Sequence, residues 1–426
     1  MSAVAAPRPA VGTRLMAGPP LASGAERWQD HARRLGARPA GGPWLMDALE
    51  KSGLRGRGGA AFPAGRKWAA VADASEGNAV VVINASEGEP LSLKDRTLVS
   101  SRPHLVIDGA LLAAETLRAT DVFIYFSRGS DVAERAVRDA LKERGDGPAV
   151  KLVRTSHRYI AGEASAAVNR VAGGPSKPKF SLTRTAEKGV DDRPTLVQNA
   201  ESIAHVAMIA RYGPDWFRAL GTPGSPGTTL MTVCGNIRRP GVYEVNPAAD
   251  LGGVVDAAGG PASRPGGALL GGYFGSWIGP SALATLPLDG ERLKSEFGAS
   301  FGCGVVALLP ERSCAVVEST RILTYLAWES AGQCGPCVNG LAALSEAMER
   351  IAVSRPNDGD LDRVHRWIEM VRGRGACHHP DGAVGQLESA LRVFRDHLQA
   401  HVNGRPCEGL RAKGFPQPPA VGAGWR

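Results

Sequence analysis

The sequence predicts three folded parts in series: an α/β domain, a small α+β unit and a helical bundle. In the first half of the chain, apolar runs typical of buried strands alternate with helical patterns, which favours a largely parallel sheet. A Gly/Pro-rich stretch near Gly221 is typical of a linker, and from Thr320 onward almost every segment has helical periodicity. We expect the three parts at 41–220, 221–315 and 316–405, between an arm at 1–40 and a tail at 406–426.

The first part begins after the arm. Residues 1–40 are rich in Ala, Pro, Gly and Arg without clear periodicity, so we expect them to be flexible and largely extended. An amphipathic helix follows from Trp44 to Ser52, and Gly53 is placed to end it. Beyond a glycine cluster, the expected strands are Ala79–Ala85, Val122–Phe126 and Val150–Thr155, and the expected helices are Pro103–Arg118 and Asp131–Lys142.

The second and third parts follow the linker. Strands are expected at Thr228–Cys234, Gly241–Val245, 268–274 and 305–309, with a short helix at Leu251–Ala258. The remaining helical patterns follow one another with short connecting loops, which favours a four-helix bundle. Their expected ranges are Ile322–Ser330, Val338–Val353, Leu361–Val371 and Val384–Val402.

Composition narrows the class of protein. The 50 basic residues exceed the 42 acidic ones, which favours an acidic partner or an anionic cofactor such as a nucleotide. No dense Lys/Arg run with interleaved aromatics occurs, so nucleic acid is not an expected ligand. No stretch approaches the roughly 20 apolar residues that span a bilayer, and the N-terminus lacks an apolar signal core. The 7 cysteines, mostly in the last third, favour reduced thiols and a cytoplasmic location.

The densest glycine cluster lies between Gly53 and Trp68. Glycine lets backbone N–H groups approach a phosphate or a flat ring without obstruction by a Cβ atom. The spacing matches neither G-x-G-x-x-G nor a Walker loop, and the cluster follows a helix instead of a strand. Cations and aromatic rings share the segment, which favours an anionic aromatic ligand over a plain turn. These side chains are Arg55, Arg57, Phe62, Arg66, Lys67 and Trp68.

A second polar cluster follows the first expected strand. It contains Asn84, Ser86, Glu87 and Glu89, and Lys94-Asp95-Arg96 comes soon after. Polar residues just past the carboxyl end of a parallel strand lie where α/β sheets bind ligands. A solvated loop is the alternative interpretation of the same residues.

The cysteines form the third motif. Cys334-Gly-Pro-Cys337 lies between two expected helices, and Cys377 lies near the start of a later one. CGPC is also the thioredoxin tetrapeptide, but that fold needs strands around the motif and only helices follow here. Three thiolates with His378 or His379 could bind zinc, whereas an iron–sulfur cluster takes four cysteines. Unreactive thiols are the remaining alternative.

Together these motifs resemble the FMN- and NADH-binding subunit of respiratory complex I and the related diaphorase subunits of NAD-linked hydrogenases and formate dehydrogenases. The resemblance runs from about Trp44 to His401, with several motifs in the same order. It implies that the first part is a flavin-binding α/β domain and that the small unit is a β-grasp domain of the soluble-ligand-binding type. It also implies that the four-helix bundle is of the type that carries a [4Fe–4S] cluster.

The matching motifs imply site roles for residues of this chain. Gly53–Trp68 resembles the FMN loop, Asn84–Pro90 the next flavin-contacting segment, and Tyr159–Glu163 the stretch against the isoalloxazine. Lys177–Phe180 resembles the segment whose aromatic ring flanks the adenine of NADH, and Pro194–Glu201 resembles the one that closes the FMN phosphate site. The implied cofactor-binding residues are Gly56, Arg57, Gly58, Gly59, Phe62, Lys67, Asn84, Ser86, Glu87, Glu89, Tyr159, Gly162, Glu163, Phe180, Gln198 and Asn199. The implied iron ligands are Cys334, Cys337 and Cys377.

Four positions depart from the family pattern. The bundle motif Cys-x-x-Cys-x-x-Cys has Ala331 in its first position, and alanine cannot ligate iron. Ser86 stands where Asp is usual, Ala164 replaces a Glu on the nicotinamide side, and Gln198 stands where Asn is usual. These losses concern the cluster and NADH more than FMN, because the glycine loop is intact. A substitute fourth ligand could come from water, an exogenous group, or Cys303, Cys314 or Cys407.

The resemblance implies an NADH dehydrogenase that transfers hydride from NAD(P)H to FMN and passes electrons to an iron–sulfur centre or a ferredoxin-like partner. One alternative is a catalytically altered or inactive homologue that acts as a scaffold for a redox partner. A zinc-stabilised interaction module built on the three cysteines is a third hypothesis.

Overall fold

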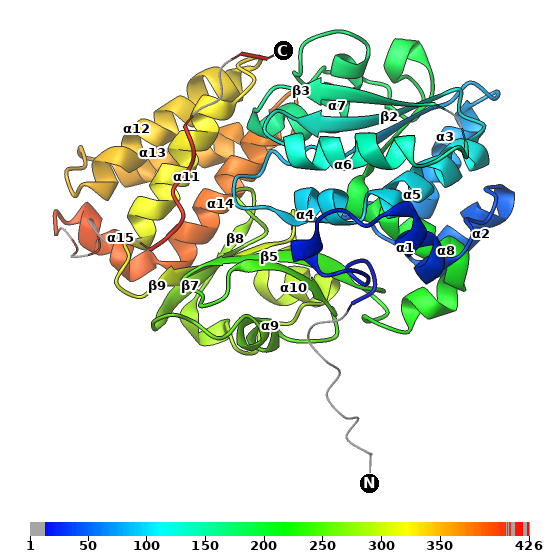
Figure 1. Cartoon of the computed structure of the whole chain (residues 1–426). Coiled ribbons are helices and arrows are strands. Elements are labelled where there is room, and N and C mark those ends of the chain that lie inside the picture. The colour runs from blue at the N-terminus through cyan, green and yellow to red at the C-terminus, as the bar shows by residue number, and fades with distance from the viewer. Residues whose placement is uncertain are drawn as a thin grey trace.

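The computed structural model describes residues 13–147, 149–405, 407, 409, 414–420 and 424–425. They form a mixed α/β fold with two sheets and a group of C-terminal helices (Figure 1). In this view the first sheet and its helices lie at the upper right, the second sheet lies below them, and the C-terminal helices stand on the left. Within the described ranges, no helix combines the length and the hydrophobicity needed to cross a bilayer.

The first sheet has four parallel strands in the order β3-β2-β1-β4. Val80 and Val82 of the central strand β1 belong to one hydrophobic core, and Val81 and Ile83 belong to the other, because successive side chains point to opposite faces. Both faces are therefore covered, as is usual for a parallel sheet. The strands are β1 Val80–Asn84, β2 Asp121–Ser127, β3 Val150–Thr155 and β4 Thr195–Asn199.

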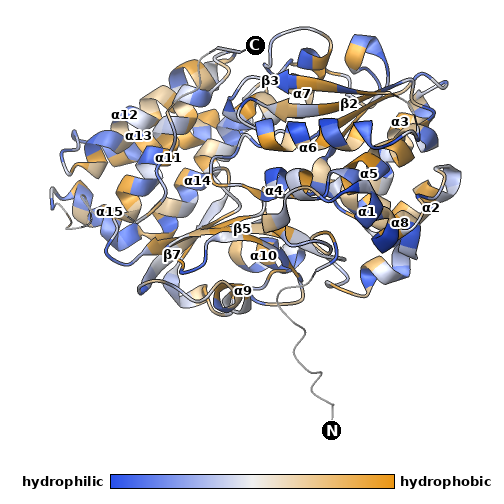
Figure 2. Cartoon of the chain, in the orientation of Figure 1, coloured by the Kyte–Doolittle hydropathy of each residue, from blue (hydrophilic) through white to orange (hydrophobic). Residues whose placement is uncertain are grey.

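Helices cover the two faces of this sheet. The short helix α7 contacts all four strands on one face, whereas α5 and α8 pack against each other on the opposite one. Figure 2 shows strand β2 as largely hydrophobic, while α6 beside it alternates hydrophilic and hydrophobic turns. The helices are α1 Trp28–Leu35, α2 Pro43–Ser52, α3 Ala64–Ala74, α4 Lys94–Ser101, α5 Pro103–Leu117, α6 Asp131–Lys142, α7 Ala164–Val171 and α8 Ala200–Arg218.

The N-terminal segment differs from the extended arm that we expected. Residues 28–35 form helix α1, and His31 on this helix contacts Asp108 of α5 at 2.9 Å in a fully buried pair. Upstream, the Arg102 guanidinium donates to the backbone carbonyls of Met16, Ala17 and Pro19. These buried polar contacts hold the segment against the first domain, and a periodicity of apolar residues does not reveal them.

The second sheet has five strands in the order β6-β5-β9-β7-β8. Strands β5 and β9 are parallel and the other neighbouring pairs are antiparallel. One face packs on α9 and α10, and the other packs on the C-terminal helices. The elements are β5 Thr229–Gly235, β6 Gly241–Val245, α9 Leu251–Ala257, β7 Pro265–Leu270, β8 Ser276–Ile278, α10 Gly290–Phe297 and β9 Val305–Pro310.

The C-terminal region contains five α-helices among its described residues, whereas the sequence predicted four. The helix expected at Val384–Val402 is divided at Phe394, which leaves helical geometry at φ −109° and ψ 33°. The Phe394 ring packs on the buried Trp277 with centroids 5.3 Å apart, so a tertiary contact accompanies the break. The helices are α11 Ala315–Glu329, α12 Leu341–Ala352, α13 Asp360–Val371, α14 His379–Val393 and α15 Arg395–Val402.

Candidate functional site

The glycine loop folds back on itself beside the carboxyl end of strand β4. The Gly56 N–H donates to the Phe62 carbonyl at 2.8 Å, which closes the loop. Gly59 has φ +114°, a conformation that favours glycine. A Cβ atom on Gly58 would lie 3.2 Å from the Asn199 Cβ, so the loop backbone approaches the end of β4 closely. The absence of side chains on these glycines therefore lets the loop backbone lie close to the end of β4.

Arg57 and Lys67, the two cations of this segment among the implied cofactor-binding residues, have different positions. The Arg57 guanidinium donates to the backbone carbonyls of Pro226 and Thr228, each at 3.0 Å, so it ties the loop to the second domain. The Lys67 Nζ donates to the Val197 carbonyl at 2.6 Å and lies in the wall of a cavity described below. Burial lowers the pKa of both groups. Lys67 is therefore the better placed of the two to face an anionic ligand.

Asn84 and Ser86 form a hydrogen-bonded pair at the end of strand β1. The Ser86 hydroxyl donates to the Asn84 Oδ1 at 2.6 Å, and the Asn84 amide donates to the Gly162 carbonyl at 2.7 Å. A Cβ atom on Gly162 would meet the Ser86 oxygen at 2.9 Å. These three predicted site residues therefore lie together, and they join two segments that are far apart in the sequence.

Glu87 and Glu89 form hydrogen bonds with other parts of the chain. Glu87 accepts from the backbone N–H groups of Asp95 and Arg96, so it caps the start of α4. Glu89 is buried and accepts from the Tyr159 hydroxyl at 2.9 Å and the Tyr273 N–H at 2.7 Å. Burial raises the pKa of Glu89 to about 7. Both carboxyls thus serve contacts within the protein, and Glu89 links the first domain to the second.

An aromatic cluster surrounds Tyr159, which lies on the 3₁₀ turn Tyr159–Gly162. Its ring packs edge to face against Phe274, with the ring centroids 4.6 Å apart. It also packs against the rings of Tyr325 and His379. No pattern in the sequence indicates this group, because its members come from four segments that only the tertiary fold brings together. The cluster fixes the position of Tyr159 and the turn that follows it.

Glu163 and Asn199 each begin a helix. The Glu163 carboxylate accepts from the Ser165 N–H at 2.8 Å at the start of α7. The Asn199 Oδ1 accepts from the Glu201 N–H at 3.0 Å, and its amide donates to Asp95 at 2.7 Å. The neighbouring Gln198 is buried on β4. These caps point the N-termini of α7 and α8 toward the carboxyl edge of the sheet, where a helix end favours an anion.

A cavity of about 1010 Å³ brings together residues from several of the predicted segments, although no residue of Asn84–Pro90 or Pro194–Glu201 lines it. Its wall includes Phe62 and Lys67 from the glycine-loop region, Glu163 at the start of α7, Phe180, and Cys377 from the C-terminal region. Phe62 and Phe180 are 49% and 68% exposed, so both rings are available to a ligand. The wall also carries Lys179, which lies in the predicted segment Lys177–Phe180, and Arg184 and Lys188, which sequence reasoning did not single out.

The three predicted iron ligands lie at one end of the helical region. Cys337 is on the π-helical turn Pro336–Gly340, and burial, with Cys334 and Cys377 nearby, raises its pKa to about 12. Ala331 is buried at the first position of the motif and offers no ligand atom. Of the possible substitutes, Cys303 instead donates to the Gly271 carbonyl at 3.1 Å.

The single-ion zinc site considered for these cysteines is not formed by the described residues. Neither adjacent histidine joins the thiols in a group whose ligand atoms lie within 4.8 Å of one another. The buried His379 Nε2 bonds to the Leu326 carbonyl at 2.8 Å, and the His378 side chain is 98% exposed.

The residues fit FMN more completely than they fit a four-iron cluster. Around the end of the first sheet, the buried atoms Arg57 Nε, Arg96 Nε and Gln198 Oε1 have no partner among the described residues. Buried polar atoms usually have partners, so this edge has capacity for a polar ligand. A cubane takes four cysteine ligands, and the motif residues supply three of them.

Comparison with known proteins agrees with this geometry. Residues 49–208 match the Nuo51 FMN-binding domain, and residues 318–401 match the NADH-ubiquinone oxidoreductase-F iron-sulfur binding region. The F subunit of the NADH-quinone oxidoreductase of Streptomyces coelicolor is 33% identical over 386 residues, which cover 85% of this chain and 84% of that protein. An NADH-quinone oxidoreductase F subunit of Rhizobium meliloti is 31% identical and is covered over 90% of its length.

A solved structure of a related protein also matches this chain. One chain of an NAD⁺-reducing [NiFe]-hydrogenase matches with a TM-score of 0.77 and 29% identity over 84% of this chain. The match spans 62% of the hydrogenase chain. On the shared domains and on the length of the match to the curated relatives, this chain belongs to the family of the NADH-quinone oxidoreductase F subunits.

Proposed function

We propose that this protein is an FMN-dependent oxidoreductase that takes hydride from NAD(P)H and delivers electrons to an iron–sulfur centre or a ferredoxin-like partner. The observation that carries the proposal is the cavity, because it joins the glycine-loop region, the exposed Phe180 and Cys377 in one space. FMN, when bound, accepts two electrons together and releases them singly.

The walls of the cavity suit a flat anionic cofactor and a dinucleotide. Phe62 and Phe180 present exposed aromatic faces on which planar rings can stack. Lys67, Lys179 and Lys188 supply positive charge for phosphate groups. These residues would bind and orient the reactants, and planar rings stacked on Phe62 and Phe180 would exclude water from the contact.

The loop after strand β1 holds the shape of the site. Asn84 and Ser86 fix the backbone at Gly162, and Glu89 fixes the Tyr159 hydroxyl. These bonds join the sheet edge to the 3₁₀ turn and would hold both segments in place beside a bound flavin. Ser86 and Ala164 stand where the family carries carboxylates, so the reactants meet a less negative wall here.

We further propose the finer identities of the other two parts. The five-stranded sheet with α9 and α10 acts as a β-grasp domain, and α11–α14 act as a bundle of the iron–sulfur type, at the domain bounds predicted above. The excess of basic residues supports an acidic iron–sulfur partner subunit. The free thiols of all seven cysteines support a cytoplasmic location.

Removal of the exposed ring tests the nucleotide part of the proposal. Phe180→Ala should raise the Kd for NADH about tenfold, since base–aromatic stacking is worth about 1–3 kcal/mol. FMN affinity should stay unchanged, because the ring flanks the nucleotide. Val132→Ala, at an exposed position of α6 outside this cavity, is the matched control. Equal NADH affinity in both variants contradicts the assignment, and a protein that binds neither FMN nor NADH favours the scaffold alternative.

A further inference from the structure

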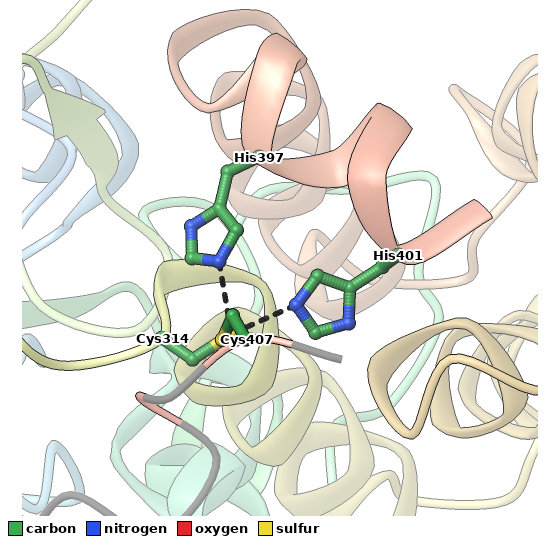
Figure 3. Close-up of side chains that lie close together, drawn as sticks. All are labelled: Cys314, His397, His401 and Cys407. Carbon is green, nitrogen blue, oxygen red and sulfur yellow. Dashed lines mark hydrogen bonds between the residues drawn. The ribbon is translucent and has the colours of Figure 1, made fainter. Parts of the chain in front are cut away.

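Two cysteines and two histidines meet at the far end of the helical region, apart from the cysteines assigned to iron. We propose that Cys314, His397, His401 and Cys407 bind one zinc ion that fastens helix α15 and Cys407, which follows it, to the start of helix α11. Each residue offers one ligand atom, and these four atoms lie within 4.8 Å of one another. Figure 3 shows both imidazole rings turned toward the Cys314 sulfur, with Cys407 beside it.

The distances match a tetrahedral ion. The Cys314 Sγ lies 3.6 Å from the His397 Nε2 and 3.4 Å from the His401 Nε2. Zinc binds sulfur at about 2.3 Å and imidazole nitrogen at about 2.0–2.1 Å, and a tetrahedral angle between these bonds separates the two ligand atoms by about 3.5 Å. The two observed sulfur–nitrogen separations lie just above and just below this expected value. Zinc commonly takes two cysteines and two histidines in structural sites.

Surrounding groups orient His401 as a ligand. Its ring is fully buried, and its Nδ1 lies 3.1 Å from the Ser354 hydroxyl and 3.3 Å from the Ile351 carbonyl. A ring N–H at Nδ1 donates to that carbonyl, which leaves a lone pair on Nε2 facing the cysteines. Metal-bound histidines are usually held by such a contact on the other ring nitrogen. His397 and His401 are four residues apart on α15, so their side chains lie on the same face of the helix.

Burial raises the pKa of the Cys314 thiol, and the start of helix α11 offsets part of that effect. Cys314 is the N-cap of the fifteen-residue helix α11, and its sulfur accepts from the Val317 N–H at 3.4 Å. The positive end of a helix and an N–H donor both stabilise a thiolate. Zinc binding would form two sulfur–zinc bonds and release one proton from each thiol, so the two thiolates balance the charge of the ion.

Hydrogen bonding alone explains the close approach of these four side chains less well than a shared metal ion does. One thiol donates a single S–H, yet the Cys314 sulfur is close to the bare nitrogen of His401 and to His397 as well. A two-iron cluster with these residue types places its histidines and cysteines on different irons. In this group the His–Cys separations suit a single ion. A Cys314–Cys407 disulfide would leave both imidazoles without a role, and it is one outcome of the test.

The first test is metal analysis of the full-length protein, purified without chelators. We expect about one zinc per chain, independent of any iron and of FMN. His397→Gln and Cys407→Ser should each lower the zinc content per chain at least tenfold. The matched control is Cys377→Ser, which removes a cysteine outside the group and should keep the zinc. A zinc-free wild type, zinc that persists in both ligand variants, or zinc lost from the control alone overturns the proposal.

A second measurement on the wild-type chain avoids dependence on the folding of variants. Cobalt exchanged for zinc should give the intense visible bands of a tetrahedral ion and a sulfur-to-cobalt charge-transfer band. Weak octahedral bands would overturn the proposal, and so would peptide mapping that finds Cys314 and Cys407 joined as a disulfide. Because neither result involves flavin, the zinc proposal and the oxidoreductase proposal can fail separately.

Discussion

Glu89 gives the structure a measurable dependence on pH. Its carboxyl is buried between the first two domains, where the Tyr159 hydroxyl and two backbone N–H groups donate to it. Burial raises its pKa from 4.5 to about 7 despite these donors. The folded state therefore retains this proton at pH values where the unfolded chain has lost it.

The sign and size of the effect follow from that shift. Because the folded pKa is the higher one, the contribution of Glu89 to stability is complete below the unfolded pKa and is lost as the pH rises through about 7. At about 1.4 kcal/mol per pKa unit, the loss amounts to about 3 kcal/mol, most of it between about pH 5 and about pH 8. Glu89→Gln mimics the protonated carboxyl and should escape this loss.

The assay is urea unfolding of the wild type and of Glu89→Gln across this pH range, followed by tryptophan fluorescence. The free energy of unfolding of the variant, minus that of the wild type, should rise by about 2–3 kcal/mol as the pH increases. Glu296→Gln, at a surface pair with Arg292, is the control and should show a flat difference. A difference for Glu89→Gln as flat as that of the control would refute the reasoning.

Three further changes have defined outcomes. Gly88→Ala would place a Cβ atom 2.3 Å from the Tyr159 carbonyl oxygen, so FMN affinity should fall at least tenfold in a fluorescence titration, and an unchanged Kd contradicts this. Lys94→Met removes a fully buried ammonium from two 2.9 Å ion pairs, which should cost about 3–5 kcal/mol in urea unfolding; a loss below about 1 kcal/mol would show that the carboxylates relax freely. Ala331→Cys supplies the absent thiol, so iron and sulfide per chain should rise after reconstitution, and equal content in both proteins argues against this position as the fourth ligand.

Local patterns predicted the elements that carry a regular distribution of apolar residues. Strand β3 and helix α6 have the predicted bounds, because apolar residues interspersed with polar ones mark the half-buried strand and an amphipathic stripe marks the helix. Strand β4 was not predicted, since its five residues include polar ones and its place beside β1 depends on the fold. Helix α1 was missed for the same reason, because its His31–Asp108 contact is tertiary.

For the candidate site, too, the sequence predicted some features and the tertiary fold determined others. The sequence identified which segments carry the chemistry, and the fold brings Phe62, Lys67, Glu163 and Phe180 to one cavity. It could not indicate the direction of each side chain. Arg57 donates to backbone carbonyls of the second domain. Because these acceptors are brought to it by the tertiary fold, the spacing of residues in the sequence could not reveal this contact.

The most direct test of the oxidoreductase assignment is an anaerobic absorbance spectrum of the purified protein with FMN, recorded before and after NADH is added. We expect flavin bands that bleach on addition of NADH, because Lys67 and the two exposed rings, Phe62 and Phe180, line one cavity. A colourless protein that does not retain added FMN would contradict the assignment, and a bound flavin that NADH leaves oxidised would contradict its NADH step.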